Sequence, residues 1–261
     1  MIAVDSTDQF QRSKMIKAIL FDVNGTLRVR EAHETTQKSA RQRILEILGK
    51  KTVEDAFWDQ LEENYKLYGA WAGQCLVQLS EAEIWTNWML PDEPKEKVAL
   101  EAANLMLAWS ERKGRVVPKP ETEPVLRELM ARGYTLGLIS NTMSTLDIPG
   151  FIERNGWQKY FRVVLLSAFE KSRKPSPDLY LKAASLLAVD PDECVYVGNR
   201  YSKDIIGCKK AGFTLGIMLI DSGKSPSEIL DENGRPDLVI DSLYQLLDYF
   251  PVMLKDYPHI N

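Results

Sequence analysis

The chain is poor in histidine and cysteine, and this scarcity excludes several kinds of site. Its 261 residues include two histidines, His33 and His259, so a Ser/His/Asp triad or a histidine metal cluster has little support. The three cysteines are far apart and odd in number, which fits neither a disulfide framework nor a metal-ligand spacing. We therefore expect a protein of a reducing, cytoplasmic compartment. The cysteines are Cys75, Cys194 and Cys208.

Long apolar runs and excess positive charge are also absent. No stretch approaches the roughly 18 apolar residues of a membrane span, and the N-terminus lacks a signal-peptide core. The net charge of −4 disfavours non-specific binding to nucleic acid or anionic lipid, so local cations must hold any anionic substrate. Residues 1–14 are polar, and we expect a disordered leader or sequence upstream of the natural start. A monomer and a homodimer are equally compatible with the sequence.

Apolar, strand-like segments alternate with helical patterns along most of the chain. This alternation is typical of a doubly wound, mainly parallel α/β sheet. In such sheets chemistry collects at the carboxyl ends of the strands, where polar clusters occur here. Strands are expected at 16–21, 134–139, 163–166, 194–197, 214–219 and 238–240, and helices at 121–132, 178–187, 203–211 and 242–250.

One region breaks this alternation and reads as helices alone. It spans residues 34–113 and directly follows the first polar loop, as a lid over a site would. Five tryptophans lie in it, and they either fill a small helical core or, for one or two of them, face the cleft and select an apolar substrate. The helices are expected at 34–49, 53–69, 80–90 and 95–112, and the tryptophans are Trp58, Trp71, Trp85, Trp88 and Trp109.

The loop after the first strand carries the most functional information. Asp22 ends the apolar strand, and Gly25 breaks it as a tight turn requires. Side chains at positions i and i+2 of an extended chain point the same way, so Asn24 accompanies Asp22. A carboxylate and an amide therefore face the same side, which suits a nucleophile with an assisting group.

Four motifs in order give the chain, over about residues 16–250, a resemblance to the haloacid dehalogenase superfamily of hydrolases. The resemblance implies a Rossmann-like core with the first strand central, at 15–27 and 118–261. It also implies a helical cap at 28–117, inserted between the first two motifs. The motifs are FDVNGTL at 21–27, ISNT at 139–142, RKPSP at 173–177, and VGN at 197–199 through Asp204 and Ala211-Gly212.

The resemblance assigns roles to the polar residues of these motifs. Asp22 is the expected nucleophile, which forms a covalent acyl intermediate with the substrate. Ser140 would hydrogen-bond the transferring group, and its neighbour Asn141 joins the candidate catalytic set. Lys174 would pair with Asp22 and with charge on the intermediate. Thr26 either fixes the loop and offers a hydroxyl or is an ordinary turn residue.

Two amides depart from the pattern of the family's phosphatases. Asn24 stands where they carry an acid, and Asn199 stands where they carry a carboxylate, whereas Asp204 is retained. An amide cannot protonate a leaving group, a step worth about 10²–10⁴-fold. We therefore expect slow cleavage of ordinary phosphate monoesters. Acyl phosphates, activated phenols or halides should suffer less, because they leave without a proton.

The same exchanges bear on metal binding. Mg²⁺ prefers oxygen ligands, commonly one or two carboxylates. Asp22 and Asp204 supply carboxylates, Asn24 its backbone carbonyl and Asn199 a neutral amide oxygen. The sequence therefore predicts a Mg²⁺ site that is weakened rather than lost. Asn24-Gly25 is also a deamidation-prone pair, which would install the missing acid unless the folded loop prevents it.

Three functions stay open from the sequence. The first is a phosphatase-like hydrolase acting on a small anionic substrate. The second is a metal-independent 2-haloacid dehalogenase, since that branch also lacks the acid at position 24 and Tyr180 fits a tyrosine found there. The third is a degenerate fold kept as a binding protein. Positive or titratable residues near the site could touch the substrate or lie on solvated surface; they are His33, Arg28, Arg30, Arg41 and Arg43.

Overall fold

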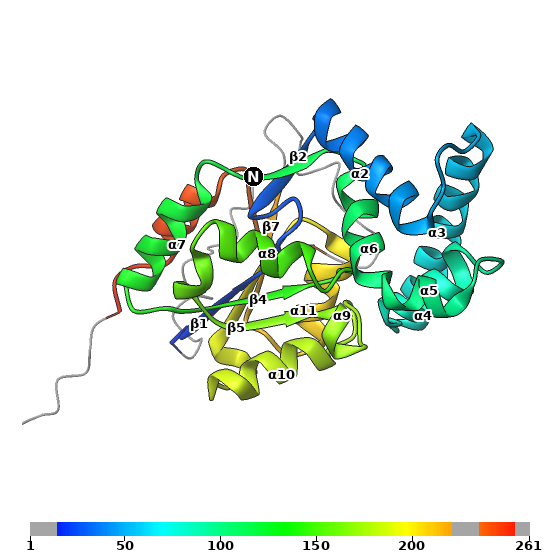
Figure 1. The fold of residues 1–261 in the computed structure, drawn as a ribbon. Coiled ribbons are helices and arrows are strands. Elements are labelled where there is room, and N and C mark those ends of the chain that lie inside the picture. The colour runs from blue at the N-terminus through cyan, green and yellow to red at the C-terminus, as the bar shows by residue number, and fades with distance from the viewer. Residues whose placement is uncertain (1–14, 221–234, 254–261) are drawn as a thin grey trace, which may run out of the picture.

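A six-stranded parallel sheet forms the centre of the molecule (Figure 1). The computed structural model describes residues 15–220 and 235–253, so the expected leader at 1–14 lies outside the described residues. The strand order is β5-β4-β1-β6-β7-β8, which confirms the doubly wound α/β fold. The strands are β1 Ala18–Phe21, β4 Thr135–Ser140, β5 Phe161–Leu166, β6 Cys194–Gly198, β7 Leu215–Leu219 and β8 Leu238–Ile240.

The first strand is central in the sheet, and both of its faces are covered. All four residues of β1 are fully buried, and the strand pairs in parallel with β4 on one side and β6 on the other. A strand covered on both faces is a continuous apolar run, as it is here. The carboxyl ends of β1, β4 and β6 therefore lie side by side at one edge of the sheet.

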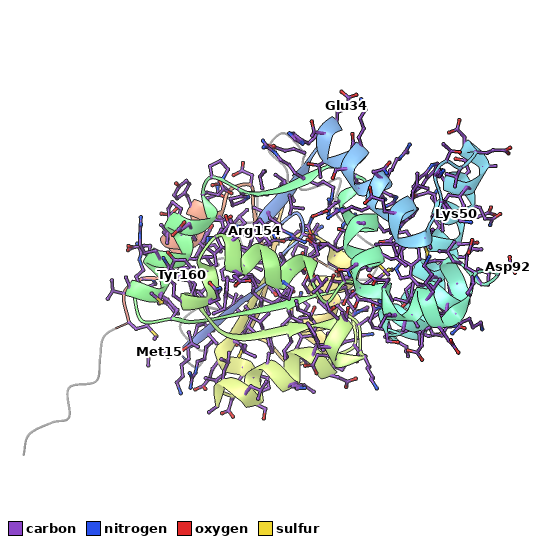
Figure 2. All side chains as sticks on the ribbon, viewed as in Figure 1. Met15, Glu34, Lys50, Asp92, Arg154 and Tyr160 are labelled. Atoms are coloured by element: carbon purple, nitrogen blue, oxygen red, sulfur yellow. The ribbon has the colours of Figure 1, made fainter. Side chains whose placement is uncertain are left out.

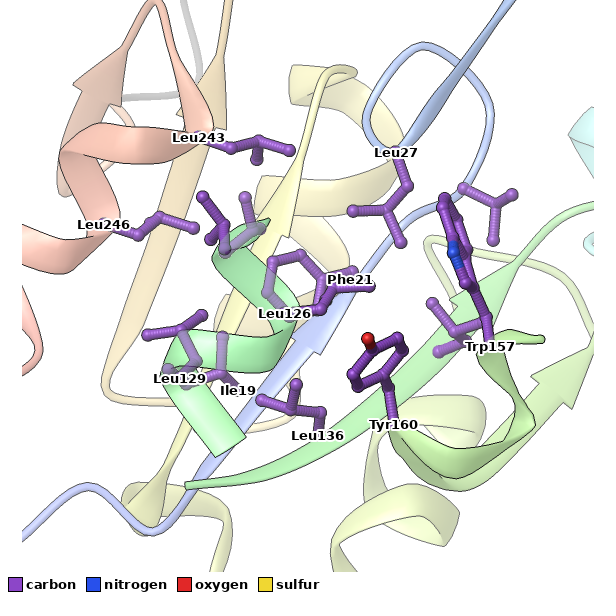
Figure 3. Close-up of a cluster of buried hydrophobic side chains, with 14 of the residues drawn as sticks. Ile19, Phe21, Leu27, Leu126, Leu129, Leu136, Trp157, Tyr160, Leu243 and Leu246 are labelled. Carbon is purple, nitrogen blue, oxygen red and sulfur yellow. The ribbon is translucent and has the colours of Figure 1, made fainter. Parts of the chain in front are cut away.

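Alternate residues of β1 enter two separate cores. Ile19 and Phe21 pack with Leu126, Leu129 and Leu246 on one face (Figure 3). Ala18 and Leu20 enter the opposite core. The helices contributing to the first core are α7 Thr122–Ala131, α8 Asp147–Arg154 and α12 Leu246–Tyr249, and those of the second are α10 Asp178–Leu187 and α11 Ile206–Lys210.

Five helices lie beside the carboxyl end of the sheet, to the right in Figure 1, and we call them the cap helices. Two antiparallel strands, β2 Arg28–Glu31 and β3 Arg115–Pro118, connect them to the sheet. Sequence patterns did not predict these two strands, and the expected helices differ in extent. The cap helices are α2 Glu34–Leu48, α3 Asp55–Cys75, α4 Glu81–Ile84 with a π-helical turn at Trp85–Met89, α5 Lys95–Leu100 and α6 Ala102–Glu111.

The tryptophans of this region form the core of the cap helices. Trp85 and Trp109 are buried, and their rings meet edge to face at 6.2 Å. The other three, Trp58, Trp71 and Trp88, pack against the same cluster. Figure 2 labels Lys50 and Asp92 in this part of the molecule, at the right, and Tyr160 at the other end of the molecule, at the left. Among the described residues, no helix combines the length and the apolar character needed to cross a bilayer.

Candidate active site

Asp22, Ser140, Lys174 and Asp204 meet at the carboxyl edge of the sheet. Ser140 Oγ donates to Asp22 Oδ1 at 3.0 Å, and Lys174 Nζ donates to the same oxygen at 2.7 Å. Lys174 Nζ also donates to Asp204 Oδ1 at 2.6 Å. Both side-chain contacts of Asp22 use Oδ1, so Oδ2 is left without a hydrogen bond among the described residues. Asp22 and Asp204, which are 182 positions apart in sequence, thus belong to one cluster.

Close packing brings Asp204 to Lys174. Asp204 lies on the π-helical turn Tyr201–Ile205, which follows β6. A Cβ at Gly198 would lie 2.4 Å from Asp204 Cγ, so only glycine leaves room for this approach. The backbone N–H of Arg200 donates to Asp204 Oδ2 at 2.9 Å. Both oxygens of Asp204, which is 1% exposed, are therefore engaged.

Lys174 is charged although it is buried. Burial disfavours its ammonium, but Asp204 and Asp22 outweigh this cost and raise the pKa of Lys174. Tyr196 provides a third partner, because its hydroxyl lies 2.8 Å from Lys174 Nζ and donates to the Ile139 carbonyl at 2.6 Å. Burial raises the pKa of Tyr196 well above its ordinary value, so this hydroxyl stays neutral. Sequence patterns gave no sign of Tyr196.

Asn141 holds the loop that carries the lysine. Its Oδ1 accepts from the Lys174 backbone N–H at 2.9 Å, and its Nδ2 donates to the Lys174 carbonyl at 3.0 Å. Two hydrogen bonds to one residue fix the backbone from which the ammonium extends. The side chain of Asn141 also lines the adjacent cavity.

The amide of Asn24 is oriented by an arginine. Arg28 Nε donates to Asn24 Oδ1 at 2.9 Å, while Arg28 Nη1 and Nη2 donate to the two carboxylate oxygens of Asp147 at 3.0 and 2.7 Å. Arg28 is only 1% exposed and is therefore a structural cation rather than an attractor of substrate. The Gly25 N–H donates to the Arg28 carbonyl at 2.8 Å, and that engagement opposes deamidation, which requires the same nitrogen to attack Asn24.

Asn199 packs against the first loop. Gly25 has a φ of +85°, and a Cβ there would lie 2.1 Å from Asn199 Nδ2. Asn199 Oδ1 is buried without a hydrogen-bond partner in the described part of the chain, as is Thr26 Oγ1. A buried acceptor without a donor costs free energy unless a ligand satisfies it. Within residues 15–220 and 235–253, no three His, Cys, Asp or Glu side chains are grouped to hold a metal.

A cavity of about 670 Å³ adjoins these residues, between the sheet edge and the cap helices. Asn24, Gly25 and Asn141 line it, whereas Asp22, two residues before Asn24, is 7% exposed and is not among its lining residues. Trp109 lines it too, so one core tryptophan also faces the cleft. Its six cations outnumber its single carboxylate, Asp147, although the chain is acidic overall; they are Arg28, Arg30, Arg112, Lys113, Arg173 and Lys203.

Most of the other candidate residues serve the structure. His33 caps helix α2, where its Nδ1 accepts from the Thr36 N–H. Arg43 pairs with Glu111, and Arg41 lies over the Trp58 ring. The hydroxyl of Tyr180 donates to the Lys203 carbonyl at 3.0 Å, and Tyr180 does not line the cavity. Arg173, Arg112 and Lys203 do line it, and sequence analysis missed them because nothing marked which charges face inwards.

The chain is similar in sequence to named phosphatases. It is 30% identical to glyceraldehyde 3-phosphate phosphatase of Methanopyrus kandleri over 93% of this chain and all of that protein. It is 26% identical to phosphoserine phosphatase of Thermus thermophilus over 77% of this chain and 75% of that protein.

Solved structures share the fold at lower identity. The 2-haloacid dehalogenase of Pseudomonas syringae pv. Tomato superposes with a TM-score of 0.64 and 23% identity, covering 90% of this chain and 97% of that one. A HAD phosphatase from Thermococcus onnurineus gives 0.57 and 22%, covering 91% and all of the respective chains. Residues 16–212 match the family of haloacid dehalogenase-like hydrolases. With these motifs, this sheet and these relatives, the chain belongs to the haloacid dehalogenase-like hydrolases.

Proposed function

We propose that the protein is a phosphatase-like hydrolase that transfers a phosphoryl group from a small anionic substrate to Asp22 and then to water. The observation that carries this proposal is the pairing of Asp22 Oδ1 with Ser140 and Lys174, which leaves Oδ2 directed to no partner in the described chain. The two donors hold the carboxylate in one orientation. An oriented oxygen that is left free to attack is what nucleophilic catalysis requires.

In the first step, an oxygen of Asp22 attacks phosphorus, the bond to the leaving oxygen breaks, and an aspartyl phosphate forms. Ser140 and the ammonium of Lys174 offset negative charge as it develops. In the second step, water attacks the phosphorus, releasing inorganic phosphate and the Asp22 carboxylate. Asn24 neither gives nor takes a proton at either step. The favoured substrates are therefore those whose leaving group has a low pKa and departs without a proton.

The residues present fit a Mg²⁺ ion of modest affinity. Asp22 Oδ2 and the orphaned, buried Asn199 Oδ1 are oxygen donors of the kind Mg²⁺ takes, and the backbone carbonyl of Asn24 is a third. Asp204 would join them only by giving up one of its present hydrogen bonds. Bound Mg²⁺ would supply positive charge to the phosphoryl oxygens. We therefore propose that this site binds Mg²⁺ weakly.

The helices between β2 and β3 form the lid in this proposal, and the division into core at 15–27 and 118–261 with a cap at 28–117 is part of it. The substrate would occupy the cation-rich cavity beneath that lid. We place the protein in the cytoplasm, as a monomer or homodimer. Names of the phosphatase relatives support a phosphate-ester substrate, and they support phosphatase over dehalogenase activity.

A substrate panel tests the proposal. p-Nitrophenyl phosphate, acetyl phosphate and 2-chloropropionate are each supplied with Mg²⁺ or with EDTA. Phosphate release that EDTA suppresses is the expected result. Chloride release that is insensitive to EDTA would instead establish a dehalogenase. No turnover of any compound by the wild type or by Asn24→Asp would favour a binding protein.

A further inference from the structure

Arg173 is a buried cation without a carboxylate partner. Its side chain is 7% exposed, and its Nη1 donates to Gln78 Oε1, a neutral acceptor that is itself 2% exposed. Its Nε is buried with no hydrogen-bond partner among the described residues. No ion pair of the described chain includes Arg173, and burial lowers the pKa of its guanidinium. An uncompensated buried charge is costly, so it is expected where a ligand supplies the opposite charge.

The position of Arg173 ties it to the candidate active site. It directly precedes Lys174, whose ammonium holds Asp22, and it lines the cavity of about 670 Å³. The lysine extends into the cluster of carboxylates, whereas the arginine lines the cavity beside the cap residues Tyr65 and Gly69. Adjacent Cα atoms lie about 3.8 Å apart. The loop that positions Lys174 against Asp22 therefore also places Arg173 at the cavity.

Three other cations of the cavity pair with carboxylates of the protein. Arg28 pairs with Asp147, and Arg112 pairs with Glu62. Lys113 also lies 3.6 Å from Glu62. Arg173 differs from these three in having no carboxylate. Arg30 and Lys203 also line the cavity without an ion pair in the described part of the chain, but Arg30 is half-buried and Lys203 is exposed, whereas Arg173 is buried.

We infer that the substrate carries a carboxylate in addition to its phosphoryl group, and that Arg173 binds this carboxylate. The inference rests on the proposed phosphatase function and names its substrate class: small phosphorylated carboxylic acids. A guanidinium presents paired N–H donors that match a carboxylate in a two-point contact. Lys203 adds positive charge to the same end of the cavity. The orphaned guanidinium thereby distinguishes these substrates from phosphate esters with neutral tails.

A matched substrate pair tests the inference. 3-Phosphoglycerate and glycerol 3-phosphate differ only by a carboxylate in place of a hydroxymethyl group. The absence of an acid at position 24 and the affinity for metal affect both substrates alike, so these effects cancel in the ratio of the two kcat/KM values. The wild type is expected to show kcat/KM at least ten-fold higher for 3-phosphoglycerate. Arg173→Gln should lower this ratio at least ten-fold, mainly through KM, which corresponds to about 1.4 kcal/mol.

Two further variants serve as controls for the effect of Arg173→Gln. Arg173→Met keeps an unbranched side chain and removes the buried charge without adding a polar group, so it should fold even if Arg173→Gln does not, and it should lower the ratio equally. Arg115→Gln removes an exposed arginine that pairs with Glu31 outside the cavity, and it should leave the ratio unchanged. A wild-type ratio near one, or an equal loss for both substrates in the Arg173 variants, would overturn the inference.

A binding measurement tests the carboxylate site independently of the proposed catalysis. Calorimetric titration of the wild type and Arg173→Met with 3-phosphoglycerate and glycerol 3-phosphate measures the same preference without turnover. If no phosphate is released but the carboxylate compound binds at least ten-fold more tightly to the wild type alone, the phosphatase proposal fails and the carboxylate site stands. If phosphate is released without any such preference, the carboxylate site fails and the phosphatase proposal stands.

Discussion

Arg28 Nε donates a hydrogen bond to Asn24 Oδ1 at 2.9 Å, while its two terminal nitrogens donate to the carboxylate of Asp147. This contact fixes the amide in the position from which a carboxylic acid would serve a leaving group. It also means that an acid placed there would meet a guanidinium. The substitution at position 24 is therefore accommodated by a built hydrogen-bond network.

Asn24→Asp should restore proton transfer. We expect kcat/KM for glycerol 3-phosphate to rise at least ten-fold, because general acid–base catalysis contributes up to about 10²–10⁴-fold. Arg28 favours the ionised form of the new carboxyl, so its pKa is lowered and the gain should be greatest on the acidic side of neutrality. Acetyl phosphate, whose leaving group needs no proton, is the internal control and should change far less. Equal gains for both substrates would contradict the assigned role of position 24.

Lys174→Met should unfold more easily and lose activity. Removing the ammonium leaves Asp22 and Asp204 buried together without a cation, which costs about 3–5 kcal/mol of unfolding free energy. Because the pKa of Lys174 is raised above 10.5, this contribution is complete at neutral pH and declines only as the pH rises beyond that value. Urea unfolding at pH 7 measures it. Lys182→Met, which removes an exposed lysine paired with Glu170, is the control and should change stability by less than about 1 kcal/mol.

Asn199→Asp should strengthen Mg²⁺ binding. The amide oxygen is already buried without a donor, and a carboxylate there adds the negative charge that the site lacks. Calorimetry should give millimolar or weaker affinity for the wild type and at least ten-fold tighter binding for the variant. Asn87→Asp adds the same charge on the exposed surface of the cap helices and should change nothing. Micromolar binding by the wild type would show that the site is not weakened.

Only one thiol should react in the native protein. Burial raises the pKa of both Cys194 and Cys208 to about 12, which keeps them protonated at neutral pH. Cys75 is exposed at the end of helix α3. A disulfide reagent at pH 7 should therefore release one equivalent of chromophore, and Cys75→Ser should release none until denaturant is added. Rapid labelling of Cys75→Ser without denaturant would contradict this burial.

The sequence was sufficient to predict the sheet and the cluster at its edge. Apolar runs such as Leu20-Phe21 predict buried strands because both faces of a parallel sheet are covered, and the polar residue after each run is then placed at the same edge. The meeting of Asp22 with Lys174 needed the four motifs as well, since nothing local joins residues 152 positions apart.

Helix α8, by contrast, could not be predicted. Pro149 and Gly150 normally argue against a helix, yet proline is tolerated in the first turn, where its missing N–H has no intrahelical partner. Missing this helix hid Asp147 and therefore the network around Arg28. Arg173 was similarly hidden, because its burial depends on Gln78 and the cap helices, which are distant in sequence.

The covalent step is the centre of the account, and direct detection of the intermediate tests it. The protein is mixed with acetyl phosphate and Mg²⁺, quenched in acid within one turnover, digested and analysed by mass spectrometry. We predict that the peptide containing Asp22 gains the mass of one phosphoryl group, and that Asp22→Asn shows neither this gain nor phosphate release. Steady phosphate release by Asp22→Asn, or release by the wild type with an unmodified Asp22 peptide, would contradict the account.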